Sequence, residues 1–122
     1  MKYLILLLSL TLSSCNAQRK DCSNFKSGTF RFADAKYVDY IVERNDSIQY
    51  EKNNKSGRII KGSVKWIDHC KYTLTYISDN QGDASIIGKT IIVRIVNITA
   101  KGYMYEAQIG KETSRNEMIK IE

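Results

Sequence analysis

The residues of this chain with the greatest chemical reactivity are three cysteines and a single histidine. Asp68, His69 and Cys70 are consecutive, so they bring together the residue types of a nucleophile and its base. A catalytic cysteine needs a base that a separate element holds against it, whereas neighbouring residues on a strand point to opposite faces. Cys22, His69 and Cys70 also cannot easily surround a zinc ion, because two of the three are adjacent. We therefore predict no catalytic residue, no metal site and no cofactor.

The remaining cysteine, Cys15, follows an apolar segment at the start of the chain. Residues 1–3 contain a lysine, residues 4–12 form an apolar run (LILLLSLTL), and residues 12–15 read LSSC. A membrane-spanning helix needs about 20 apolar residues, so this run has instead the length of a signal-peptide core. Leucine, two small residues and cysteine match the bacterial lipobox, in which the thiol accepts diacylglycerol. Residues 1–14 are thus predicted as a signal peptide and Cys15 as the lipidated residue; the alternatives are a secretory signal with a chance cysteine and a buried apolar strand.

The lipobox also predicts the organisation and location of the chain. Removing residues 1–14 from 122 leaves 108 residues, divided into a lipidated tether (15–27) and a single β domain (28–122). Several acyl chains on one N-terminus anchor a protein durably, so the membrane is a predicted partner. Asn16 follows the lipidated cysteine, where some bacteria use aspartate to retain lipoproteins on the inner membrane. The expected location is therefore the outer membrane, with the domain on its periplasmic or cell-surface side.

Cys22 and Cys70 remain as an even pair once Cys15 is lipidated. Exported proteins fold in an oxidising compartment, where such pairs form disulfides. We predict a Cys22–Cys70 disulfide, with two free buried thiols, or metal ligation together with His69, as the alternatives.

Aromatic residues recur at alternate positions along the chain and have two interpretations. They could line a ligand cavity, or they could fill a small barrel completely, which strands of only six to ten residues favour. The residues proposed to line the ligand site or the core are Trp66, Tyr72, Tyr76, Tyr103 and Tyr105. Whether the space between Trp66, Tyr72 and Tyr103 is filled distinguishes the two interpretations.

Short segments rich in β-branched and aromatic residues alternate with turn residues, which predicts strands. The expected strands span 29–32, 37–44, 47–52, 59–68, 71–78, 90–98, 103–109 and 118–121. In the second of them, Val38, Tyr40 and Val42 should share one face. Asn45 and Asp46 predict a tight turn through tolerance of positive φ, and one helical turn is expected over 84–88. The fold class is all-β: an antiparallel meander of seven to eight strands, as a small barrel or a curled sheet.

Gly62 lies inside the predicted strand 59–68, where a glycine often marks a bulge or bend.

The composition excludes several classes of protein. The chain has 122 residues, 19 Lys and Arg, 13 Asp and Glu, a net charge of +6 and no proline. This length allows one domain. Nucleic-acid binders concentrate positive charge on one helix or stripe, but here the basic residues alternate with apolar ones along the strands. They are therefore assigned to a solvated face, and no nucleic-acid partner is predicted.

Three segments carry a resemblance to a known group of proteins. Residues 22–30 (CSNFKSGTF), 43–49 (ERNDSIQ) and 64–74 (VKWIDHCKYTL) look like those of small lipoproteins of Gram-negative bacteria. The resemblance implies a lipocalin-like fold, a function that is not settled and no catalytic residues. Some members carry the name DNA topoisomerase IV, but 108 exported residues cannot supply a breakage domain, an acidic metal site and an ATPase.

These observations favour a non-enzymatic, lipid-anchored envelope protein with a structural or protein-interaction role and an envelope protein as partner. The alternative is lipocalin-like binding of a small apolar ligand. A cavity open at one end of the barrel would favour the ligand, whereas a closed interior with an exposed apolar patch would favour a protein partner.

Overall fold

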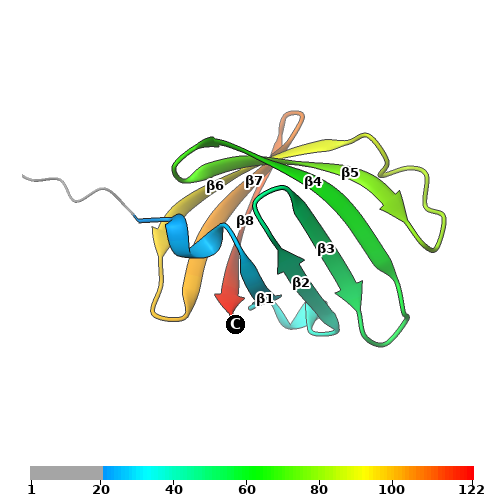
Figure 1. Ribbon diagram of the computed structural model, residues 1–122, viewed down its shortest axis with the longest axis horizontal. Helices are drawn as coiled ribbons and strands as arrows, with labels where there is room; N and C mark the ends of the chain where they lie inside the picture. Colours follow the sequence, from blue (N-terminus) through cyan, green and yellow to red (C-terminus); the bar gives the residue numbers. More distant parts are fainter. Residues whose placement is uncertain (1–20) are drawn as a thin grey trace, which may run out of the picture.

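The computed structural model describes residues 21–122, so the predicted signal peptide and the predicted lipidation site, Cys15, lie outside the described residues. Within them, eight antiparallel strands each pair with the next strand in the chain, and the first pairs with the last. The result is a closed barrel (Figure 1). The strands are β1 (Gly28–Phe32), β2 (Tyr40–Arg44), β3 (Ile48–Asn53), β4 (Ile59–Asp68), β5 (Lys71–Asp79), β6 (Thr90–Ile98), β7 (Gly102–Ile109) and β8 (Glu112–Lys120).

This architecture confirms the all-β meander, and of the two expected forms it is the closed barrel. No helix in residues 21–122 is long and apolar enough to cross a membrane.

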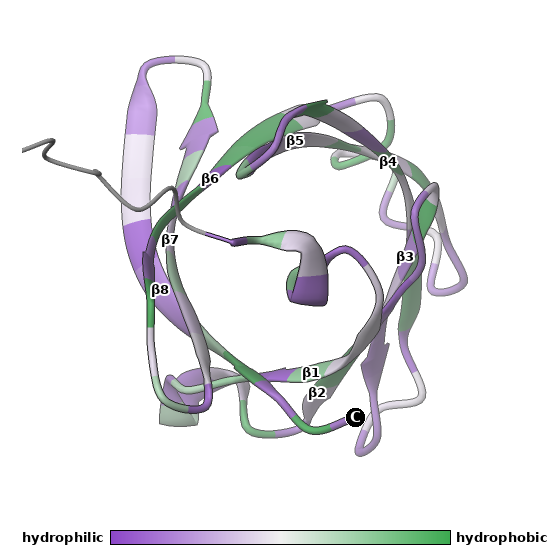
Figure 2. Cartoon of the chain, turned by 60° about the vertical axis from the view of Figure 1, so that its left-hand side comes forward, coloured by the Kyte–Doolittle hydropathy of each residue, from purple (hydrophilic) through white to green (hydrophobic). Residues whose placement is uncertain are grey.

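The two ends of the barrel differ. A short 3₁₀ helix, η1 (Ser23–Phe25), precedes β1 and lies across the bore at one end, as Figure 2 shows. We call this the η1 end; it also carries the short connections between β2 and β3, β4 and β5, and β6 and β7. The far end carries the longer connections 33–39 and 80–89. Cys22 and Phe25 are buried in the same core as the strands, so part of the segment expected as a tether packs into the barrel.

Two strand predictions were wrong in extent, for opposite reasons. The strand expected at 37–44 begins only at Tyr40, because Asp34 accepts a hydrogen bond from the Lys36 N–H and caps a 3₁₀ helix, η2 (Ala35–Tyr37). Val38 therefore does not share the inward face and is 73% exposed. Conversely, β8 starts at Glu112 rather than at 118, because residues 112–119 pair along the whole of β7 although they are mostly polar.

The turns also differ from expectation in mechanism. Residues 45–47 do connect β2 and β3, but no residue other than glycine among those described has positive φ. Instead, the Asn45 side chain accepts hydrogen bonds from the Ser47 and Ile48 N–H groups at 3.0 and 2.8 Å. Residues 84–88 form turns and not a helix.

Gly62 marks a register shift between β4 and β5, as predicted. A Cβ at this position would lie 2.5 Å from the Cδ1 atom of Leu74, so a larger residue would require the Leu74 side chain to shift.

Candidate functional site

The η1 end of the barrel is fixed by a disulfide. Cys22 and Cys70 are bonded with their Cα atoms 5.3 Å apart, which confirms the predicted pair. Because Cys70 is bonded to Cys22, it has no thiol to act as a nucleophile. The His69 ring accepts a hydrogen bond from the Cys22 N–H at 3.4 Å, so this histidine supports the N-terminal segment.

Arg44 is the polar centre of the η1 end, although it is only 4% exposed. Its guanidinium donates to the Gln49 side-chain oxygen at 2.8 Å, the Phe25 carbonyl at 2.8 Å and the Tyr103 hydroxyl at 3.0 Å. It also lies 4.7 and 4.9 Å from the ring centroids of Phe30 and Tyr72. The buried charge is therefore compensated by hydrogen bonds and by aromatic faces.

The space between Trp66, Tyr72 and Tyr103 is filled. The Trp66 and Tyr72 ring centroids are 4.6 Å apart, and Phe25 from η1 packs 4.9 Å from the Tyr103 ring. The Arg44 guanidinium contacts both tyrosines, because it lies 4.9 Å from the Tyr72 ring centroid and is hydrogen-bonded to the Tyr103 hydroxyl. For this half of the barrel, the prediction of a filled interior is confirmed.

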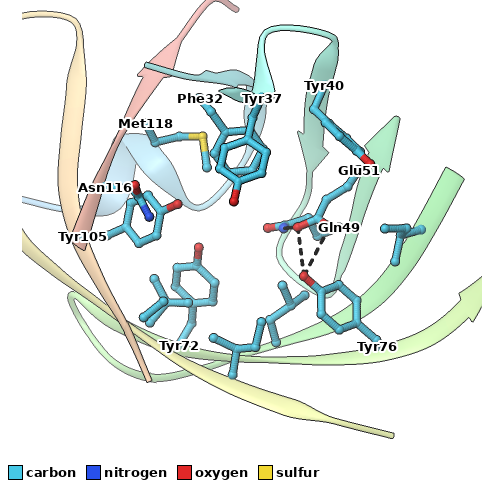
Figure 3. Close-up of a pocket in the computed structure, with 15 residues that line it drawn as sticks. Phe32, Tyr37, Tyr40, Gln49, Glu51, Tyr72, Tyr76, Tyr105, Asn116 and Met118 are labelled. Carbon is cyan, nitrogen blue, oxygen red and sulfur yellow. Dashed lines mark hydrogen bonds between the residues drawn. The ribbon is translucent and has the colours of Figure 1, made fainter. Parts of the chain in front are cut away.

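The far half of the barrel is hollow, so the prediction of a filled interior is wrong there. A cavity of about 280 Å³ lies between strands that contribute mainly apolar and aromatic side chains. Tyr72, Tyr76 and Tyr105 line it, whereas Trp66 and Tyr103 do not. Figure 3 shows the lining residues, which are Phe32, Tyr37, Tyr40, Gln49, Glu51, Ile60, Tyr72, Leu74, Tyr76, Ile91, Val93, Tyr105, Ala107, Asn116 and Met118.

A carboxylate, that of Glu51 on β3, faces this cavity. The Tyr76 hydroxyl lies 3.1 and 3.2 Å from its two oxygens and donates to them, and the Gln49 side-chain amide donates at 3.2 Å (Figure 3). Gln49 therefore bridges Arg44 and Glu51, accepting from the one and donating to the other. A chain of hydrogen bonds thus runs from the core of the η1 end to the wall of the cavity.

Burial changes the pKa values of these groups. Removal from water raises the pKa of the Glu51 carboxyl, although the hydrogen bonds from Tyr76 and Gln49 and the charge of Arg44 oppose this. Burial and the nearby Glu51 also raise the pKa of Tyr76 and of Tyr105. Both phenols therefore stay protonated near neutral pH and can act as hydrogen-bond donors.

Part of the far end is held by polar contacts between two connections. Arg58 pairs with Asp79 at 2.8 Å, and these hydrogen bonds lower the pKa of the Asp79 carboxyl. The Asn80 side chain accepts from the Ile59 N–H at 2.8 Å and donates to the Gly57 carbonyl at 3.0 Å. The β3–β4 and β5–β6 connections are thus tied together beside the cavity.

Sequence reasoning missed Arg44, Gln49 and Glu51. Arg44 was assigned to a solvated face because it is charged, and the strand containing Glu51 was given no inward face. The position of each residue along its strand was the available signal. Arg44 is two residues from the inward-pointing Val42, so it shares the same face. Glu51 pairs in register with both Val42 and Ile60, which also point inward.

No protein-family model, curated protein or solved structure matches this chain.

Proposed function

We propose that the protein is a lipid-anchored envelope protein whose barrel binds a small, mainly apolar ligand. The observation that carries this proposal is the cavity of about 280 Å³ in the far half of the barrel. Its volume is close to the lower limit of about 300 Å³ for pockets that hold drug-sized molecules. A ligand of one ring system with a short chain would suit this space.

The composition of the wall supports a ligand with an apolar body. Aliphatic side chains such as Ile60, Leu74 and Val93 line one part, and aromatic residues line the rest. A few polar groups among apolar ones are typical of sites that orient a small molecule. Because Arg44 and Phe25 fill the η1 end, the ligand would enter from the far end.

The proposed anchor suits this arrangement. Cys15 precedes Asp21 by six residues, and six extended residues reach about 20 Å at most. Cys22 is bonded to Cys70 at the η1 end. Lipid on Cys15 would therefore hold that end close to the outer membrane, with the far end directed away from it.

A cavity-filling variant tests the ligand proposal. N-phenyl-1-naphthylamine, which is neutral at pH 7 and fluoresces in apolar surroundings, is titrated into the mature chain. Ala107 lines the cavity and Gln108 is its neighbour on β7 with the opposite orientation, so Ala107→Trp should abolish binding while Gln108→Trp should leave it unchanged. Equal binding by both variants, or no binding by the wild type, would contradict the proposal.

A second candidate is the protein-interaction role, favoured by large apolar side chains exposed at the far end. These are Val38, Ile59, Ile77, Ile87 and Ile109, each between 39% and 73% exposed. A photocrosslinking residue at Val38 should capture one specific envelope protein if this role holds, and the same residue at Ile67, near the η1 end, should not. Identical crosslinks from both sites would contradict it.

A further inference from the structure

We propose that the ligand carries a basic amine, which Glu51 binds as a cation inside the barrel. This inference rests on the proposed function and names the chemical class of its ligand. It depends on the charge of the cavity wall, the partners of the Glu51 carboxylate and the aromatic groups around it.

The wall carries a single charge. Among the described residues that line the cavity, Glu51 is the one with an acidic or basic side chain, and the others are apolar, amide or phenol groups. Arg44 lies deeper and is absent from the lining. A molecule in the cavity therefore meets one acidic group in apolar surroundings, where the ionised carboxylate attracts a cation much more strongly than it would in water.

The Glu51 carboxylate has hydrogen-bonding capacity to spare. Its described donors are the Tyr76 hydroxyl, which shares one proton between two oxygens, and the Gln49 amide. An ionised carboxylate can accept about four hydrogen bonds. An ammonium group has several N–H donors, so it could use the acceptor positions that Tyr76 and Gln49 leave open.

No ion pair among residues 21–122 includes Glu51. The two cations whose charges act on it, Arg44 and Arg58, have other partners. Arg44 donates to three other groups, and Arg58 pairs with Asp79. A buried carboxylate is stabilised when a cation pairs with it directly, and an amine would supply that missing partner.

Aromatic residues complete the site for a cation. Figure 3 shows the hydroxyls of Tyr37, Tyr72 and Tyr105 directed toward the same interior space as Glu51. Phe32 and Tyr37 also line that space, and their ring centroids are 5.3 Å apart. Aromatic faces attract ammonium groups, and the hydroxyl oxygens can accept N–H donors. An acidic ligand would instead place a like charge beside Glu51.

Three probes with the same apolar body test the inference: 4-phenylbutylamine, 4-phenylbutan-1-ol and 4-phenylbutanoate. Their affinities for the mature chain are measured by calorimetry at pH 7.5. We expect the amine to bind the wild type at least tenfold more tightly than the alcohol, and the acid most weakly. Lowering the pH to 5 should weaken binding of the amine but not of the alcohol, because it favours the protonated Glu51.

Glu51→Gln removes the charge and keeps the shape, so it should reduce the preference for the amine to less than threefold. Glu43→Gln is the matched control, because Glu43 pairs with Lys52 on the outer face of the barrel. It should keep the full preference. Circular dichroism checks the folding of each variant, and Glu51→Asp, which retains the charge, should keep most of the preference if Glu51→Gln does not fold.

Equal affinity of the wild type for the amine and the alcohol, or tighter binding of the acid, would overturn this inference. The proposed ligand cavity would still stand if N-phenyl-1-naphthylamine binds and Ala107→Trp prevents it. Absence of binding by all four probes would overturn both proposals.

Discussion

Arg44 and Glu51 are charged residues that point into a barrel of mainly apolar and aromatic side chains, and Gln49 connects them. Their environments give them different roles. Each nitrogen of the Arg44 guanidinium has a described hydrogen-bond partner, so this side chain joins η1, β3 and β7. Glu51 keeps unused acceptor positions on a cavity wall, so it is free to meet a ligand.

Replacing Arg44 should destabilise the fold strongly. Arg44→Met keeps much of the volume but leaves the Phe25 carbonyl and the Gln49 oxygen without their donor. Each unsatisfied buried group costs about 1–3 kcal/mol, so for the two groups we expect a loss of about 2–6 kcal/mol in the free energy of unfolding. Arg31→Met is the control, because Arg31 is exposed on β1 and should change stability by no more than about 0.5 kcal/mol. Urea denaturation followed by Trp66 fluorescence measures both, and similar losses would contradict the role of Arg44.

The raised pKa of Glu51 predicts a pH dependence of stability. When the folded pKa lies above the unfolded value of about 4.3, the folded state binds the proton more tightly. The contribution of Glu51 is then fully present below the unfolded pKa and is lost as the pH rises through the folded pKa. The stability of the wild type relative to Glu51→Gln should therefore decrease from pH 4 to pH 8 in urea denaturation. A difference that stays constant, or increases, would show that the folded pKa is not raised.

At the scale of elements, β4 and β6 have the predicted bounds because their patterns of apolar residues are strong. Apolar and polar residues alternate along β4, and β6 is an almost continuous run of β-branched apolar residues. That signal fails for the first half of β8, where residues 112–115 are exposed and only pairing with β7 holds them as a strand. It also fails for η2, because the Asp34 side chain caps this short helix by accepting a hydrogen bond from the Lys36 N–H.

The same reasoning explains what could be predicted of the candidate site. Of the five aromatic residues proposed to line the ligand site or the core, Tyr72, Tyr76 and Tyr105 line the cavity, whereas Trp66 and Tyr103 do not. Whether the barrel is filled depends on where η1 packs and on which half the large side chains occupy. No local pattern encodes either feature, because both arise from contacts between residues distant in sequence, such as Phe25 with Tyr103.

The disulfide joins two elements, because it attaches η1 to the β4–β5 connection. It closes a loop with a sequence separation of 48, so the chain-entropy estimate is a stabilisation of about 4 kcal/mol. We expect Cys22→Ala/Cys70→Ala to lower the melting temperature by more than about 15 °C. The barrel strands should persist in far-ultraviolet circular dichroism, since none of their pairings requires the bond. An unchanged melting temperature would contradict a stabilising role.

At the scale of the whole molecule, the two ends of the barrel differ in packing. The disulfide, Arg44 and the packed aromatics lie at the η1 end, where the described residues begin, and the cavity lies toward the far end. A rigid end near the membrane and a hollow end away from it would let a ligand reach the cavity without crossing the lipid surface. This orientation depends on the anchor being at Cys15.

Cys15→Ala should therefore remove the anchor without disturbing the barrel. Without a thiol to accept diacylglycerol, the protein should incorporate no labelled palmitate and should either keep residues 1–14 or be released from the membrane fraction. Cys22→Ala is the matched control, because it removes a cysteine seven positions later that the disulfide uses; it should still be labelled and processed. Mass spectrometry of the N-terminus and fractionation of the envelope report both results. Labelled fatty acid in Cys15→Ala would place the anchor elsewhere, and the orientation that brings the η1 end to the membrane would lose its basis.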